Sequence, residues 1–339
     1  MHSAELSSDT LSVTIIDHGA RIASVRTPDR NGVAGEVALG FDDEQGWLED
    51  GAFLGATIGR IANRVDGARF TVDGTEHRIT PNEGGHALHG GPQGFDKQTF
   101  VLSVVESAED GAQSLSATRR SPDGEMGFPG NLDVTVTYTV VGSALTIGMS
   151  AVTDAPTPVA LTNHTYWNLR GAPGSIEDHV FRIEADSVLP VRDDLIPTGE
   201  IDQVADTPFD LRESVRIGAQ LHTRSAQTLV TRGIDHDYLL QDRTDRLSTP
   251  VARVAEPVSG RTMTMYTDQD GLQVYTGNFL DGSKPLRSGT TARQGGAFCL
   301  EPQAHPNAVN SGTDDASRGI LRPGDSYRWW MRIEFGVEG

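Results

Sequence analysis

The sequence is poor in cysteine, aromatic residues and basic residues, and it lacks long apolar runs. Cys299 is the only cysteine among 339 residues, which excludes an intrachain disulfide and a zinc site built from several thiolates. No window approaches the roughly 20 apolar residues of a membrane-spanning helix, and no basic patch followed by an apolar stretch opens the chain. We therefore expect a cytoplasmic protein held together by its core.

The shortage of basic residues leaves a large negative charge. The chain has 28 Lys and Arg against 47 Asp and Glu, a formal net charge of −19 at pH 7. Such a charge repels phosphate backbones and anionic lipid headgroups, so we expect neither nucleic acid nor a membrane as partner. The acidic residues are scattered in small groups, as on a solvated surface. A neutral small molecule is the partner that this charge favours.

What the sequence does contain is a series of short alternating runs. Apolar and polar residues alternate with a two-residue period over 11–15, 132–138, 145–151 and 263–265, which is typical of half-buried strands. The runs are separated by turn residues, and 38 glycines and 17 prolines are spread along the chain. This pattern predicts an all-β fold, specifically a large antiparallel β-sandwich.

Two turns and one weak helical segment complete the prediction of the fold. Asp73-Gly74 and Gly142-Ser143 each separate two alternating runs, so each predicts a hairpin. No amphipathic helix is evident, and residues 209–213 with their neighbours allow at most a helical turn or two. Because no linker or repeat marks a boundary, we expect residues 1–339 to form a single domain.

Two glycine-rich segments in the first third of the chain carry polar residues suited to a binding site. In 59–65, Asn63 and Arg64 could supply hydrogen bonds to sugar hydroxyls or carboxylates; alternatively, Arg60 and Arg64 pair with surface carboxylates. In 81–97, glycines surround His86 and His89 and let the backbone approach a ligand. We assign His86 to hydrogen bonds within the loop.

Two later segments place acid–base groups next to apolar runs. In 161–169, His164 lies beside Tyr166 and Trp167, and a histidine there can act as a general acid near neutral pH. Trp167 is expected in the core. In 295–307, Glu301 shares a strand face with Cys299, so partial desolvation at a strand end would strengthen this carboxylate as a base.

Other classes of site find little support. Asp235-His236-Asp237 is a polar cluster, but no second cluster with metal-ligand spacing accompanies it, so orienting a ligand is the better interpretation. His86 and His89 likewise lack an obvious third ligand. A phosphate-binding loop, a nucleophile elbow and a dinucleotide fingerprint are also absent from the sequence. We expect neither a metal nor a cofactor.

Taken together, these segments resemble the aldose 1-epimerase, or galactose mutarotase, family. The specific patterns are Leu-His-Gly-Gly-x-x-Gly-Phe-Asp-Lys at 88–97 and Thr-Asn-His-x-Tyr-x-Asn-Leu at 162–169. The similarity extends from residue 55 to the carboxyl end in the order of the family. Pro302, Asn307 and Trp167 depart from the usual residues, which leaves the acid and base in place and affects only the expected substrate preference.

The resemblance implies a β-sandwich with a sugar site on its concave side and an enzyme that interconverts the α and β anomers of free hexoses such as galactose and glucose. It implies that Glu301 is the base at the anomeric hydroxyl, that His164 is the acid at the ring oxygen, and that His89 binds or assists there. The positions that match sugar-binding residues of the family, with a nearby aromatic wall, are Asn63, Arg64, Tyr166, Asp235, Gln273 and Phe279.

Three alternatives stay open at this point. A hexose-6-phosphate mutarotase would share the architecture, but it would need a basic cluster for the phosphate. A noncatalytic sugar-binding protein would need the binding residues without the paired Glu301 and His164, and a metal-dependent sugar enzyme would lose activity on chelation. For the assembly we expect a monomer or a weak homodimer.

Overall fold

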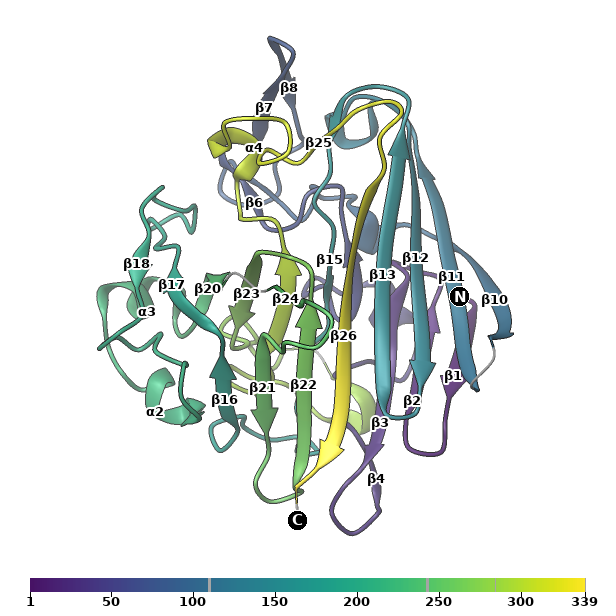
Figure 1. Ribbon diagram of the computed structural model, residues 1–339, viewed down its shortest axis with the longest axis vertical. Helices are drawn as coiled ribbons and strands as arrows, with labels where there is room; N and C mark the ends of the chain where they lie inside the picture. Colours follow the sequence, from purple (N-terminus) through teal and green to yellow (C-terminus); the bar gives the residue numbers. More distant parts are fainter. Residues whose placement is uncertain (109–110, 242–243, 284, 339) are drawn as a thin grey trace.

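The computed structural model describes residues 1–108, 111–241, 244–283 and 285–338. Its largest element is a nine-stranded antiparallel sheet (Figure 1), whose long strands alternate between buried and more exposed residues. In spatial order the strands are β10 (Val101–Ala108), β11 (Ala112–Ser121), β12 (Leu132–Val141), β13 (Ala144–Thr153), β26 (Tyr327–Val337), β22 (Arg261–Thr267), β21 (Ala252–Ala255), β16 (Val180–Ile183) and β19 (Val215–Arg216).

Two further antiparallel sheets complete the main layers. The five-stranded sheet has the order β18 (Asp202–Gln203), β17 (Ala185–Val188), β20 (Asp235–Leu240), β23 (Gly271–Tyr275) and β24 (Cys299–Gln303). The four-stranded sheet runs through β1 (Ser3–Ser7), β2 (Ser12–Ile16), β3 (Arg21–Pro28) and β4 (Ala34–Glu36). A shared core of buried apolar side chains joins them to the nine-stranded sheet, and this burial is the main stabilising contribution to the fold.

Short elements connect these sheets. Four two-stranded pairs are β5 (Ala56–Ile58) with β15 (Thr162–His164), β6 (Arg64–Val65) with β9 (Ala87–Leu88), β7 (Arg69–Val72) with β8 (Thr75–Arg78), and β14 (Thr157–Pro158) with β25 (Ile320–Leu321). The helices are α1 (Glu44–Leu48), α2 (Ile217–Leu221), α3 (Ala226–Thr231) and α4 (Ala308–Ser311), with 3₁₀ turns at Asp66–Ala68, Phe95–Lys97, Glu125–Gly127 and Arg287–Gly289. Among the described residues, no helix combines the length and apolar character of a membrane span.

The predicted β-sandwich and its hairpins are confirmed. The four alternating runs fall within β2, β12, β13 and β22 apart from Leu11, which precedes β2, and the two turns lie between β7 and β8 and between β12 and β13. Asp73 and Gly74 both have positive φ (49° and 78°), the geometry of the tight turn that matches the twist of a hairpin.

Helix is as scarce as expected, but the helical turns lie beyond residues 209–213 themselves. Residues 209–213 are irregular, and the nearest helical turns are α2 and α3. α3 begins with a capping box in which the side chains of Ser225 and Thr228 each bond the other's backbone N–H. These helices of four to six residues depend on local caps and turns, and so carry no amphipathic period that a sequence reading could find.

Candidate functional site

One face of the five-stranded sheet carries the polar residues of the site. Side chains alternate across a strand, so β23 and β24 turn Leu272, Val274 and Leu300 into the core and direct the residues between them to the other face. Strand register sets two neighbouring rows of side chains on that face: Asp235, Tyr275 and Cys299 in one, and Asp237, Gln273 and Glu301 in the other.

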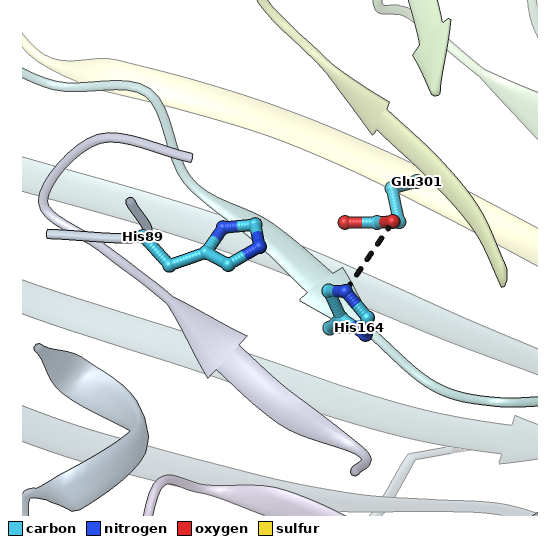
Figure 2. A group of neighbouring side chains, drawn as sticks. All are labelled: His89, His164 and Glu301. Carbon is cyan, nitrogen blue, oxygen red and sulfur yellow. Dashed lines mark ion pairs between the residues drawn. The ribbon is translucent and has the colours of Figure 1, made fainter. Parts of the chain in front are cut away.

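His164 comes to this face from a different part of the chain. It ends β15, where it pairs with Ala56 of β5. Its Nε2 lies 3.6 Å from Oε1 of Glu301, and the ring of His89 lies nearly perpendicular to its own, with 5.2 Å between the ring centroids. Figure 2 shows the three side chains converging from three separate segments. Chain segments about 75 and 137 residues from His164 thus meet at one point.

These residues surround a cavity of about 210 Å³. All nine predicted site residues line it, namely Asn63, Arg64, His89, His164, Tyr166, Asp235, Gln273, Phe279 and Glu301. Their individual roles stay predictions, but the structure does bring them together. Phe279 is 45% exposed, which places this aromatic wall at the mouth of the cavity, whereas Glu301 and His164 are buried.

Glu301 is a buried carboxyl with an unused oxygen. It is 2% exposed, and its Oε2 has no hydrogen-bond partner among the described residues. Burial, reinforced by the nearby charge of Asp235, holds its pKa well above the ordinary value. The expectation of a desolvated glutamate is confirmed, although Glu301 lies in the middle of β24 and not at a strand end.

Burial acts in the opposite direction on His164. It lowers the pKa of this histidine to about 4, because a charged imidazolium loses its hydration inside the protein. The ordinary histidine pKa of about 6.5 therefore does not apply to His164, and its role as a general acid stays a prediction. The raised pKa of Glu301 and the lowered pKa of His164 both favour placing a proton shared by the two side chains on Glu301.

His89 is fixed as a hydrogen-bond donor. The backbone N–H of Asn63 donates to its Nδ1 over 3.0 Å, and burial lowers its pKa well below the ordinary value. A neutral imidazole that accepts at Nδ1 carries its hydrogen on Nε2. Asn63, held at a φ of 60°, thus acts on His89 through its backbone, while sugar binding by its side chain stays a prediction.

This tautomer bears on metal binding. The ligand atoms of His89, His164 and Glu301 lie within 4.8 Å of one another, a spacing that a divalent metal could close. A metal on Nε2 of His89 would move the hydrogen to Nδ1, where it would face the N–H of Asn63. Two opposed donors disfavour that arrangement, so the donor set suits a sugar hydroxyl better than a metal.

The two arginines of the first segment have separate roles. Arg64 is buried and forms a two-pronged ion pair with Glu83, at 2.6 Å and 3.0 Å, so both interpretations of Arg64 hold: it lines the cavity and pairs with a carboxylate. Arg60 does neither, because its guanidinium is buried against Ser121, Thr157 and the carbonyls of Pro122 and Pro129. The positive charge of Arg64 is thus already balanced.

Other segments singled out in the sequence lie outside the cavity. Trp167 is 1% exposed in the core, as expected. The expectation that the His86 side chain bonds within its own loop was wrong. Its Nδ1 accepts the N–H of Gly67 in another segment, and its ring nitrogens lie 3.2 Å from Asp66 and 3.4 Å from Asp194. Asp237 pairs with His305 at 2.5 Å, and His236 turns to Gln227, so only Asp235 of that cluster reaches the cavity.

Sequence reasoning missed Tyr275 and Phe53. Tyr275 follows Gln273 by two residues on β23, so strand alternation could have found it. Phe53 lies in a loop at a φ of 62°, and its ring contacts both histidines, 4.6 Å from His89 and 5.8 Å from His164 between centroids. No local signal in the sequence marks it.

A larger cavity of about 480 Å³ lies elsewhere, between residues 36–40, 168–175 and 286–296. Its charged residues include Glu36 and Arg287, which pair with each other at 2.8 Å, and its lining contains no acid–base pair. The smaller cavity is therefore the candidate active site.

Comparison with known proteins agrees with this site. The profile of the aldose 1-epimerase family matches residues 2–334. The chain belongs to this family. Galactose mutarotase of Bos taurus is 42% identical over 98% of this chain and 93% of its own, and aldose 1-epimerase of Escherichia coli K12 is 36% identical over 96% and 92%.

The fold of a solved aldose epimerase homologue agrees as well. The crystal structure of the homologue from C. elegans superposes with a TM-score of 0.89 at 32% identity, covering 100% of this chain and 99% of the other. Membership in the aldose 1-epimerase family confirms the predicted resemblance, the fold and the enzyme class, an isomerase acting on carbohydrates.

Proposed function

We propose that the protein is a mutarotase that interconverts the α and β anomers of free hexoses such as galactose and glucose. The observation that carries this proposal is the Glu301–His164 pair, a buried base and acid 3.6 Å apart on one wall of a cavity lined by hydroxyl-binding groups. The names of the relatives, galactose mutarotase and aldose 1-epimerase, support the same reaction. A noncatalytic binding protein would have no need of this pair.

In each ring opening, the pair of Glu301 and His164 takes one proton from the sugar and gives one proton to it. Glu301 takes the proton of the anomeric hydroxyl, the bond between C1 and the ring oxygen breaks, and His164 gives a proton to that oxygen. The open aldehyde then rotates about the C1–C2 bond. Closure on the other face returns both protons, so the pair holds one proton at every stage and no cofactor is consumed.

The pKa shifts suit this transfer. In water a histidine is more basic than a glutamate, so moving the proton from His164 to Glu301 would be uphill. Burial raises the pKa of Glu301 and lowers that of His164, and both shifts favour moving the proton from His164 to Glu301. Acid–base transfer of this kind contributes about 10²–10⁴-fold in rate.

The remaining residues hold the sugar. His89 offers its Nε2–H, and Oε1 of Gln273 has no hydrogen-bond partner in the described part of the chain while its Nε2 donates to Asp235 at 2.7 Å. Phe53 and Phe279 add apolar surface to the cavity lining. Such contacts fix the ring and the open chain against the pair, which supplies orientation.

The charge of the cavity favours neutral over phosphorylated hexoses. Its one arginine, Arg64, is neutralised by Glu83, and Asp235 and Glu301 add two further carboxyls. A phosphate would therefore meet no unpaired cation among the described residues that line the cavity, but it would meet acidic groups. This is the physical ground for placing hexose 6-phosphates second.

Polarimetry on freshly dissolved α-D-glucose and α-D-galactose tests the proposal. We expect the protein to speed the approach to anomeric equilibrium for both sugars, with much slower turnover of their 6-phosphates. The rate should survive dialysis against a metal chelator. Sugar binding without exchange between anomers, detected by NMR saturation transfer, would contradict the proposal and favour a binding protein.

The pH profile of kcat/KM is a second test. The active form holds one proton on the pair, so activity falls when acid adds a second proton or when base removes the last. Since burial lowers the pKa of His164 to about 4, we expect the acid limb of the profile to lie near pH 4. A fall centred near 6.5, the ordinary histidine value, would contradict this assignment.

A further inference from the structure

The thiol of Cys299 lies against the nitrogen of His164 that the proton transfer leaves unused. Its Sγ is 3.6 Å from Nδ1, while Oε1 of Glu301 is 3.6 Å from Nε2. Cys299 and Glu301 are two residues apart on β24 and so face the same way. β24 thus places a thiol next to Nδ1 and a carboxyl next to Nε2 of the same imidazole.

The other neighbours of His164 leave this contact without a competing side chain. Rings of Phe53, His89, Tyr166 and Tyr275 surround it. The charged groups Asp50 and Arg21 act on it electrostatically with opposite sign, and its own main chain favours the protonated ring. Among the side-chain hydrogen bonds of the described residues, only that of Cys299 reaches Nδ1.

We propose that Cys299 is a positioning residue for the mutarotation proposed above: its Sγ accepts the Nδ1–H of His164 and so leaves Nε2 as the nitrogen that gives and takes the proton. The inference rests on that proposed function. When Glu301 holds the shared proton, Nε2 must offer a lone pair toward it, and the hydrogen of the neutral ring must then lie on Nδ1. When His164 holds the proton, Nδ1 keeps the same hydrogen, so the thiol contact is unchanged through the cycle.

A thiol is suited to this position because it is a weak acceptor. A carboxylate at Nδ1, as in the serine protease triad, orients the ring but also stabilises the imidazolium. Sulfur orients the ring without that stabilisation, so the histidine keeps a low basicity. Burial raises the pKa of Cys299 well above its ordinary value, which keeps the sulfur a neutral thiol. Cys299 does not line the cavity, so it acts through His164 and not on the sugar.

The tautomer of His164 tests the inference without any turnover. In protein labelled with ¹⁵N and ¹³C histidine, with His164→Gln to assign the signal, we expect the neutral ring of His164 at pH 7 to carry its hydrogen on Nδ1. His89 serves as the internal reference, because its contact with Asn63 requires the opposite tautomer. A hydrogen on Nε2 of His164 would overturn the inference while leaving open whether the protein is a mutarotase.

Two substitutions of nearly equal size separate hydrogen bonding from packing. Cys299→Ala removes the acceptor, and we expect kcat to fall about tenfold, part of the 10²–10⁴-fold that acid–base catalysis provides, with KM within about twofold of the original. Cys299→Ser restores an acceptor that is stronger than sulfur, so kcat should largely recover and the acid limb of the pH profile should move to higher pH. Equal kcat and equal acid limbs in both variants and the original protein would show that Cys299 only fills space.

Discussion

Glu301→Gln is expected to lower kcat for mutarotation by about 10³-fold, within the range of a lost general base. Glutamine has nearly the same shape, but its amide cannot take the proton of the anomeric hydroxyl. Because acid and base act in one transfer, His164→Ala should cost a similar factor, and the double variant should lose little more than either single variant. Polarimetry measures the rate of each variant, and circular dichroism confirms that each is folded.

A matched control for Glu301→Gln is Asp237→Asn. Asp237 lies in the same row of the sheet, is 2% exposed and hydrogen-bonds His305 outside the cavity. This change also converts a buried carboxyl to an amide, so any general effect on the sheet should appear in both variants. Near-native mutarotation rates for folded Glu301→Gln and folded His164→Ala would contradict the assignment of Glu301 as base and His164 as acid.

The fold could be predicted because its long strands, such as β12 and β13, bury only one face. The runs over 132–138 and 145–151 carry their alternation in the sequence, and the turn residues between them set the hairpin. The alternation within one run does not determine how that strand aligns with its neighbours. The juxtaposition of Asp235, Gln273 and Glu301 on β20, β23 and β24 depends on three segments that no local pattern connects.

The site residues could be predicted because their motifs resemble a family, but the chemistry of the site depends on contacts between distant segments. The tautomer of His89 is set by a backbone N–H 26 residues away. The low pKa of His164 comes from burial among rings such as that of Phe53, which sits in a loop with no strand or helix period. A sequence reading that assigns an ordinary pKa to His164 has no access to that burial.

Arg21→Met is expected to lower the free energy of unfolding by about 3–5 kcal/mol, the usual cost of leaving one partner of a buried ion pair alone. Arg21 is fully buried, and its Nη1 lies 2.7 Å from Oδ2 of Asp50 and 2.7 Å from the carbonyl of Leu54. Asp50 in turn accepts the N–H groups of Ala52 and Leu54. The loop that carries Phe53 to the two histidines is therefore anchored at this pair, and urea unfolding measures the loss.

The same anchor links stability to the site, because the ring of Phe53 lies against His89 and His164. We expect the surviving folded fraction of Arg21→Met to show a raised KM, since a loosened loop no longer fixes one wall of the cavity. Arg192→Met is the matched control: Arg192 pairs with Asp66 and Asp194 on the surface, where ion pairs contribute little. If both variants unfold at the urea concentration of the original protein, the pair of Arg21 and Asp50 does not anchor the loop.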